Sequence, residues 1–328
     1  MIMNARKGRI DEISKGAQEG PRYLRVVRSG IGGLIEASAA LDTILVANDF
    51  SNHAANAVNR IAQLADEVNL SKVTMLHVFE EPRLIPFRQI SSAPPNVNGR
   101  RVENAKRQLE AIADQLRLRT SLRVESRVEV GNVVAAIQCF AAPVGLLVLG
   151  AQGSHPLRDF ALGSTAQRVL RKTFVPVLVV RRRAEGHYRR VLVAVDFQSD
   201  ARYALDYAQA LAPQAGLNLV HVYRVPFEGK MRYSGVPDDL IGFYRAEARA
   251  AASRCMRELV SSRVSSNAVN PLIVHGDAVA TLLDKERELN ADLIVLTRRN
   301  KSLTEELLLE SVTSKLLERS RCDVLVMN

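Results

Sequence analysis

With 328 residues, of which 47% are apolar and 24% charged, the chain is long enough for two globular domains that each bury a core. It has no apolar run of the roughly 18 residues that a transmembrane helix needs, and its first residues lack the apolar stretch of a signal peptide. The net charge of +10 comes from residues 1–183, because residues 184–328 contain equal numbers of basic and acidic residues. No nucleic-acid-binding motif accompanies this charge. We therefore expect a solvated basic face and no nucleic-acid partner, with an anionic ligand or an acidic partner as the alternative.

The three cysteines are far apart and have neither metal-binding nor redox spacing. Cys139, Cys255 and Cys322 lie in segments patterned like core helices or strands, which predicts buried, reduced thiols and no disulfides. No grouping of His, Cys and Asp has the spacing of a zinc site, so we expect no dedicated metal site. These features favour a cytoplasmic protein.

Residues 1–40 mix charged residues with glycines and have no counterpart later in the chain. The segment GIGG at 30–33 is no dinucleotide fingerprint, because no predicted strand precedes it. We expect a basic extension that is flexible or loosely attached. A regulatory or partner-docking role for it is the alternative.

From residue 41 onward, short apolar runs alternate with helical segments. Runs rich in Val, Ile and Leu predict buried parallel strands near 43–49, 72–79, 121–130, 145–150 and 176–181. Apolar residues at three- and four-residue spacing predict a helix over 54–68 that Ser51 caps. A helix over 97–118 follows a proline-rich loop at 82–96, a shorter helix follows Gly131, and a last helix opens at Gly163.

The same order of segments returns about 147 residues later. ILVANDFS at 44–51 matches VLVAVDFQS at 191–199, MLHVFE at 75–80 matches LVHVYR at 219–224, GLLVLGA at 145–151 matches DLIVLTR at 292–298, and VPVLVV at 175–180 matches CDVLVM at 322–327. This repetition indicates a tandem duplication with domains at 41–183 and 184–328. Each domain is predicted to be a Rossmann-like α/β fold, with a parallel sheet of five strands, helices on both faces and ligand binding at the carboxyl ends of the strands.

A glycine-rich stretch, GAQGSHPLRDFALGST at 150–165, follows the fourth strand of the first copy. Glycine at a strand end lets a ligand approach the backbone and allows a positive φ. A helix that starts at Gly163, Ser164 and Thr165 presents unpaired N–H groups, hydroxyls and the positive end of its dipole, which together suit phosphate oxygens. The alternative is a flexible loop followed by an ordinary serine N-cap.

The spacing of Gly150, Gly153, Gly163 and Ser164 matches G-x2-G-x9-G-[S/T], and in this the chain resembles the nucleotide-binding members of the universal stress protein (UspA-like) family. The resemblance includes VANDFS at 46–51, LHV at 76–78 and VPVLVVR at 175–181, and it extends over both copies. It implies a fold like that of the adenine nucleotide alpha hydrolases. It also implies that the first domain binds ATP or another adenine nucleotide, with Mg²⁺ held through the phosphates.

The resemblance further implies where the nucleotide lies. Asp49 would be the acidic residue near it, the backbone of Val78 would meet the adenine, and the glycines with their neighbours would hold the ribose and phosphates. The full expected set is Ala47, Asn48, Asp49, Val78, Leu149, Gly150, Gly153, Gly163, Ser164 and Thr165. His155 is expected to be a solvent-exposed loop residue, with a phosphate contact as the alternative. His77 and His221 recur at matching positions, and we expect a feature of the fold and no metal ligation.

The second copy departs from the pattern at every glycine. Thr297, Asn300 and Glu310 replace the three glycines, although Ser311 and Asp196 are kept. Glu310 would bring a carboxylate to any phosphate, so we predict that the second domain does not bind ATP in the usual way. It would be a structural partner or hold another ligand. By the resemblance, the two last strands would cover each other in an intramolecular pseudo-dimer, and a homodimer of whole chains stays open.

Three functions are compatible with these observations. The first is a nucleotide-binding stress-response sensor or regulator that acts on a protein partner. The second is a slow ATPase, but the sequence has no Walker A lysine and no paired carboxylates with a nearby base, so we assign no catalytic residue. The third is a scaffold or carrier that binds a non-nucleotide ligand in the second domain, with help from the long loops at 81–96 and 225–236.

Overall fold

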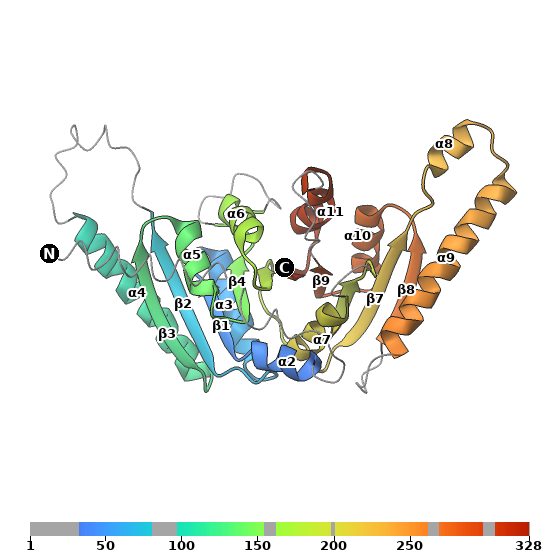
Figure 1. The fold of residues 1–328 in the computed structure, drawn as a ribbon. Helices are drawn as coiled ribbons and strands as arrows, with labels where there is room; N and C mark the ends of the chain where they lie inside the picture. The colour runs from blue at the N-terminus through green and yellow to red at the C-terminus, as the bar shows by residue number, and fades with distance from the viewer. Residues whose placement is uncertain are drawn as a thin grey trace, which may run out of the picture. The chain divides into compact units, whose positions relative to one another are not determined.

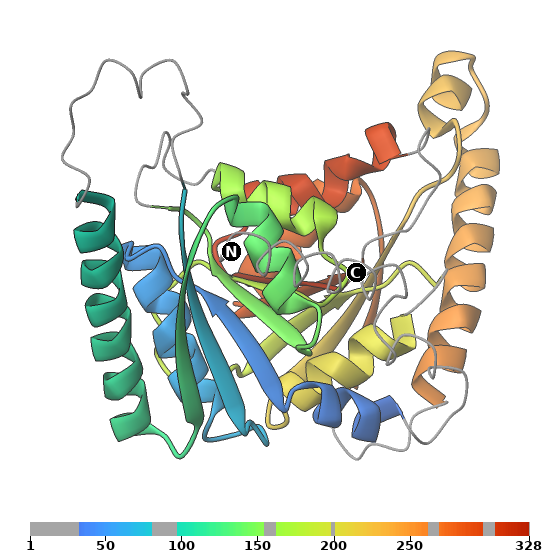
Figure 2. The ribbon, with the colours of Figure 1, turned by 60° about the vertical axis from the view of Figure 1, so that its left-hand side comes forward.

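The computed structural model describes residues 33–80, 97–153, 162–197, 201–261, 269–297 and 306–327, with the backbone alone for residues 33–36, 97–98 and 306–311. These residues divide into two compact units: unit 1 contains residues 38–184, and unit 2 contains residues 185–327 together with 33–37. Each unit is an α/β domain built on a parallel sheet (Figures 1 and 2). The predicted fold class, two tandem α/β domains, is therefore confirmed.

Unit 1 has five parallel strands in the order β3-β2-β1-β4-β5. They are β1 (Thr43–Ala47), β2 (Lys72–Phe79), β3 (Arg123–Val130), β4 (Leu146–Gly150) and β5 (Val177–Val180). The strands β1, β4 and β5 are short apolar runs that are almost entirely buried, as expected for strands covered by helices on both faces. In register, Val46 of β1 lies between Met75 of β2 and Val148 of β4.

Helices cover both faces of this sheet (Figure 1). The helices α3 (Asn52–Leu64) and α4 (Val97–Arg119) pack on one face, and α5 (Val133–Ala141) and α6 (Ser164–Lys172) pack on the other. Ser51 caps α3, as predicted, by accepting a hydrogen bond from the backbone nitrogen of Ala54 at 3.1 Å. Asn132 caps α5 in the same way, with a bond of 2.9 Å from Ala135.

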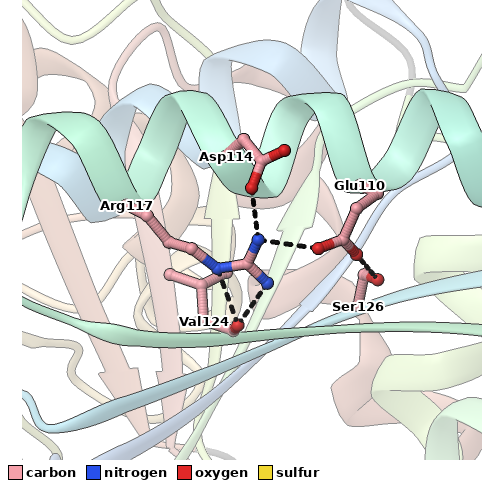
Figure 3. Close-up of polar contacts among 5 residues, drawn as sticks. All are labelled: Glu110, Asp114, Arg117, Val124 and Ser126. Atoms are coloured by element: carbon pink, nitrogen blue, oxygen red, sulfur yellow. Dashed lines mark hydrogen bonds and ion pairs between the residues drawn. The ribbon is translucent and has the colours of Figure 1, made fainter.

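A polar network fastens the edge strand β3 to α4 (Figure 3). Arg117 donates from Nε and Nη2 to the carbonyl oxygen of Val124, at 3.2 and 2.7 Å, and from Nη1 to Glu110 at 2.7 Å and Asp114 at 2.5 Å. Ser126 donates to the second carboxylate oxygen of Glu110. The hydrogen bonds from Ser126 and Arg117 hold the pKa of the Glu110 carboxyl below its ordinary value. Since many side chains of β3 are exposed, this network replaces part of the packing that central strands have.

Unit 2 repeats the architecture with the strand order β10-β9-β6-β7-β8. Its strands are β6 (Arg190–Ala194), β7 (Gly216–Tyr223), β8 (Val269–His275), β9 (Leu293–Thr297) and β10 (Asp323–Met327). Its helices are α7 (Ala201–Leu211) and α9 (Asp238–Ser261) on one face, α10 (Ala278–Glu288) and α11 (Glu306–Arg319) on the other, and the short α8 (Glu228–Tyr233), which contacts α9.

Two buried polar contacts fix the start of β10. The hydroxyl of Tyr188 donates to Oδ2 of Asp323 at 2.7 Å, and both side chains are buried. Glu286 of α10 accepts the backbone N–H groups of Arg321 at 2.6 Å and Cys322 at 2.8 Å. Each buried carboxylate is thus hydrogen-bonded, as burial of a charge requires.

The structure differs from the sequence predictions at several points. The last eight residues of the predicted extension form α2 (Gly33–Ala40), and the carbonyl of Ala40 stands where a Cβ on Gly145 would be. The predicted loop over 225–236 contains α8. Within the described ranges, no helix combines the length and hydropathy needed to cross a membrane. The loop at 82–96 lies outside the described residues, and the pairing of the two domains through their last strands stays a prediction.

The prediction of three buried thiols is wrong for two of them. Cys322 is buried, but Cys139 and Cys255 are exposed and unbridged. The reason is helical geometry. In α5 the buried positions are Val134, Ile137 and Ala141, so Cys139 points to the opposite side of the helix.

Candidate functional site

The residues predicted to bind a ligand gather at the carboxyl edge of the unit 1 sheet. The strand β1 lies between β2 and β4, and the chain runs from β1 to β2 on one side before it returns to β4 on the other. The ends of β1 and β4 therefore flank the topological switch point, which is where open α/β sheets bind ligands.

Two successive side-chain turns shape the end of β1. Asn48 is buried, and its Oδ1 accepts the N–H of Phe50 at 2.8 Å, while Oδ1 of Asp49 accepts the N–H of Ser51 at 3.1 Å. Short polar side chains that bond the backbone two residues on favour such turns. The turns end β1 two residues earlier than predicted, bring Ser51 to the N-cap of α3, and leave Asp49 exposed at the edge of the sheet.

The loop after β4 contacts the loop after β1. Oδ2 of Asp49 lies 2.9 Å from the position that a Cβ on Gly153 would occupy. The hydroxyl of Ser51 donates to the carbonyl of Gln152 at 3.4 Å. The N–H of Gly163 donates to the carbonyl of Ala151 at 2.8 Å, which attaches the start of α6 to the same loop. The structure thus brings Asp49, Gly153 and Gly163 to one place.

Gly150 has a packing role that its sequence neighbours do not reveal. A Cβ on Gly150 would lie 2.7 Å from the carbonyl carbon of His53 and 2.9 Å from the backbone nitrogen of Ala54, both in the first turn of α3. Because such distances leave no room for a side chain, glycine here lets α3 pack against the end of β4.

The glycines of the glycine-rich stretch do not use the positive φ that glycine allows. None of Gly150, Gly153 and Gly163 has a φ in the left-handed region. Among the described glycines, that conformation occurs at Gly131, Gly186, Gly235 and Gly276. Gly131 and Gly276, with φ of 145° and 154°, lie in the turns that precede α5 and α10.

The helix α6 starts without a side-chain cap. Its N-cap is Gly163 and its first residue is Ser164, so the alternative of a serine N-cap is wrong. The first turn contains no acidic residue, while Arg171 and Lys172 stand in the last turn. The first N–H groups of a helix have no intrahelical partner, and the dipole places partial positive charge there. With the hydroxyls of Ser164 and Thr165 beside it, this helix start can bind an anion such as a phosphate.

The remaining predicted residues lie at or near the carboxyl ends of their strands. Ala47 is the last residue of β1, and Leu149 precedes the last residue of β4 with its side chain buried in the core. Val78 lies one residue from the end of β2, beside Glu129 of β3. His155 lies outside the described residues.

A histidine–phenylalanine pair supports the end of β1, and sequence reasoning recognised only its histidine. Nδ1 of His77 lies 2.8 Å from the carbonyl oxygen of Asn48, and because that oxygen can only accept, Nδ1 carries the hydrogen. The imidazole stacks on Phe50, with ring centroids 4.4 Å apart. Phe50 has a φ of 63°, which is uncommon for an aromatic residue.

Unit 2 has the same pair. His221 donates to the carbonyl of Val195 at 2.8 Å and stacks on Phe197 at 4.2 Å, and Phe197 has a φ of 60°. Val195 is the counterpart of Asn48 but has no polar side chain. Both copies therefore have the stacked pair, whereas only unit 1 has the turn that the side chain of Asn48 forms. Burial lowers the pKa of His221. The expectation that these histidines belong to the fold agrees with this geometry, and the repeated Asp-Phe dipeptide was the signal for their partners.

The corresponding edge of unit 2 differs at its last helix. The helices α6 and α11 end at matching positions, Lys172 and Arg319, but α11 begins at Glu306, five residues before the counterpart of Ser164. Glu310, the counterpart of the N-cap Gly163, therefore lies within the helix. Five residues add about 7 Å of helix. Thr297 ends β9 where Gly150 ends β4, and Asn300 lies outside the described residues.

These features define a class of protein: two tandem α/β domains, of which the first has a helix start without a side-chain cap at the switch point of its sheet. The sequence profile of the Universal stress protein family matches residues 40–181 and 187–328. The chain therefore belongs to the universal stress protein family, with one family domain in each half.

Individual relatives agree with this assignment. The chain is 28% identical over 146 residues to universal stress protein YxiE of Bacillus subtilis, covering 42% of this chain and 98% of the relative. It is 29% identical over 156 residues to universal stress protein MJ0577 of Methanocaldococcus jannaschii, covering 43% and 94%. A crystal structure of a universal stress protein from Archaeoglobus fulgidus covers 87% of this chain and 98% of its own, with a TM-score of 0.67 and 21% identity. That last likeness concerns the fold alone.

Proposed function

We propose that unit 1 binds an adenine nucleotide, in the first place ATP, and that unit 2 does not bind one in the same way. The observation that carries this proposal is the start of α6, where Gly163 leaves the helix without a side-chain cap at the switch point of the sheet. The family spacing of Gly150, Gly153, Gly163 and Ser164 supports it further.

The residues at this edge fit such a ligand. The phosphates would accept hydrogen bonds from the first N–H groups of α6 and from the hydroxyls of Ser164 and Thr165. Mg²⁺ would bind through phosphate oxygens and offset the charge of Asp49. The backbone of Val78 would meet the adenine, and the main chain of Ala47, Asn48 and Leu149 would complete the site.

In this proposal the two units differ in nucleotide binding because their last helices start at different positions. At the position where unit 1 offers the free start of α6, unit 2 has residues already inside α11, whose N–H groups serve the helix. Unit 2 would then act as a structural partner of unit 1, or hold a different ligand.

We propose further that the protein is a cytoplasmic stress-response regulator. Phosphates that contact both Gly153 and Gly163 would hold the two ends of the segment between them. The surface presented to a protein partner would then depend on the nucleotide. Catalysis is no part of this proposal.

The experiment is to purify the full chain without added nucleotide, denature it, and identify released small molecules by mass spectrometry. Titration with ATP and Mg²⁺ by calorimetry follows, on the wild type, on Gly163→Glu and on the matched variant Glu310→Gly. We expect one nucleotide per chain in the wild type and in Glu310→Gly, and at least a hundredfold weaker binding in Gly163→Glu. Two nucleotides per chain, or equal binding by the wild type and Gly163→Glu, would contradict the proposal.

A further inference from the structure

Unit 2 carries a group of exposed aromatic and aliphatic side chains on α8 and the first turns of α9. These residues, which we call the hairpin patch, are Phe227, Tyr233, Leu240, Phe243 and Tyr244, and they are exposed to 72%, 95%, 42%, 56% and 41%. Leu240 lies one helical turn before Phe243 and Tyr244, whose rings are 5.9 Å apart, so these three share a face of α9. Figure 1 shows α8 and the start of α9 extending past the carboxyl ends of β7 and β8.

The helical hairpin that α8 and α9 form is anchored to the rest of unit 2 at the start of α8. Oε2 of Glu228 lies 2.8 Å from Nε2 of His275 in β8, and Oε1 pairs with Arg245 of α9 and lies 3.4 Å from Arg232. Ile241 is the only buried residue that α9 has before Ala252, so this half of the helix contributes little to the core of the unit. The anchored base presents the hairpin patch in a defined geometry.

The exposed area of the patch is comparable with that of an interface. With roughly 200 Å² for each aromatic side chain, the five residues expose about 500–600 Å² per copy. This area is at the upper end of the range, about 300–600 Å², for the largest apolar patch of a monomeric protein, and such patches are often functional. Two such patches bury about 1,000–1,200 Å² in total, which reaches the lower limit of specific protein–protein interfaces. Phenylalanine and tyrosine are also enriched in interfaces of this kind.

The charges around the patch favour a second copy of the chain over an anionic surface. Residues 227–245 contain three acidic residues (Glu228, Asp238 and Asp239) and three basic residues (Lys230, Arg232 and Arg245). The whole chain carries +10, all of it in residues 1–183. Two copies of this segment therefore carry no net charge that would separate them, and a surface with both signs can be complementary to itself across a twofold axis.

We propose that two copies of this chain associate through the hairpin patch, each hairpin covering the aromatic side chains of the other. The contact is isologous, so every residue of the patch occurs twice in it. Tyr233 and Phe243, which are the most exposed aromatic residues of α8 and α9, carry most of the association.

Sedimentation velocity of the full chain from about 1 to about 100 µM tests this, because that range detects dimers with dissociation constants up to about 100 µM. The wild type is compared with Tyr233→Glu/Phe243→Glu and with the control Leu118→Glu. Leu118 of α4 is 87% exposed, so this control also places a glutamate at an exposed apolar position, but outside the hairpin patch. Circular dichroism verifies that all three proteins have the same fold. If the double variant does not fold like the wild type, the milder variant Tyr233→Ser replaces it.

We expect the wild type and Leu118→Glu to dimerise, and the double variant to dimerise at least about tenfold more weakly. A wild type that stays monomeric over the whole range would overturn the proposal, as would a double variant that associates as tightly as the wild type. A monomeric wild type that sediments with vesicles of phosphatidylglycerol and phosphatidylcholine would also overturn it and assign the patch to a lipid surface.

Discussion

Alanine at position 150 separates the packing role of this glycine from any role toward a ligand. A Cβ there would lie 2.7 Å from the carbonyl carbon of His53 and 2.9 Å from the backbone nitrogen of Ala54. Both atoms belong to the main chain of α3 and cannot rotate away as a side chain would. The first turn of α3 has to move by roughly 0.8 Å before the contact reaches an ordinary van der Waals distance of about 3.5 Å.

The expected cost follows from this geometry. Overpacking of a well-packed core costs about 1–3 kcal/mol, and the lower chain entropy of the unfolded alanine variant offsets about 0.4–1 kcal/mol of it. We expect Gly150→Ala to lower the free energy of unfolding of unit 1 by about 1–2 kcal/mol, which lowers Tm by about 2–8 °C for a domain of this size.

Thermal unfolding of the full chain without nucleotide, followed by differential scanning calorimetry, measures this effect. Gly163→Ala is the matched control from the same motif, because the nearest atoms to its Cβ would be at 3.5 Å and its φ of −59° suits alanine. We expect the control to stay within about 0.5 kcal/mol of the wild type. An unchanged Tm for Gly150→Ala, or an equal decrease for both variants, would refute the packing argument.

Three further substitutions test other contacts. Arg117→Ala removes the hydrogen bonds to Val124 and to two carboxylates, and should lower the free energy of unfolding of unit 1 by about 1–2 kcal/mol, measured by urea unfolding. The control is Arg123→Ala, whose side chain is largely exposed and whose loss should change that free energy by nearly zero. Tyr188→Phe removes the buried bond to Asp323 and should cost unit 2 about 1.5–3 kcal/mol; a loss below 0.5 kcal/mol would contradict this. Burial lowers the pKa of His221, so the contribution of this histidine to stability is present above about pH 6.5 and is lost as the pH falls through the pKa of the folded state. His221→Asn should therefore flatten the dependence of Tm on pH between about 7.5 and 5.5. An unchanged slope would contradict this role of His221.

The fold could be predicted because its signals are local. Apolar runs and three- to four-residue spacing placed the strands and the longer helices within a few residues, and the repeat showed that both halves share one architecture. Capping by Ser51 is equally local, since donor and acceptor are three residues apart.

The contacts that the sequence did not reveal join distant segments or depend on helix orientation. The short distances that a Cβ on Gly150 would have involve His53, almost a hundred residues away, and the partner of His77 is Phe50 in the turn after β1. The exposure of Cys139 depends on which side of α5 faces the sheet. The early start of α11 had a local signal, since Glu and Leu at 306–310 favour helix, but alignment with the glycine pattern of the first copy obscured it.

The early start of α11 also affects how the two halves of the chain can evolve. Glycine at positions 297, 300 and 310 would restore the glycine pattern in unit 2 but leave the helical residues 306–309 in place. Glycine at position 310 weakens α11 by up to about 1 kcal/mol and exposes no new N–H group until residues 306–309 unwind as well. A first mutation toward the glycine pattern in this helix therefore lowers stability without freeing a helix start. This loss opposes the conversion of α11 into a helix that starts like α6, so the difference between the two domains persists.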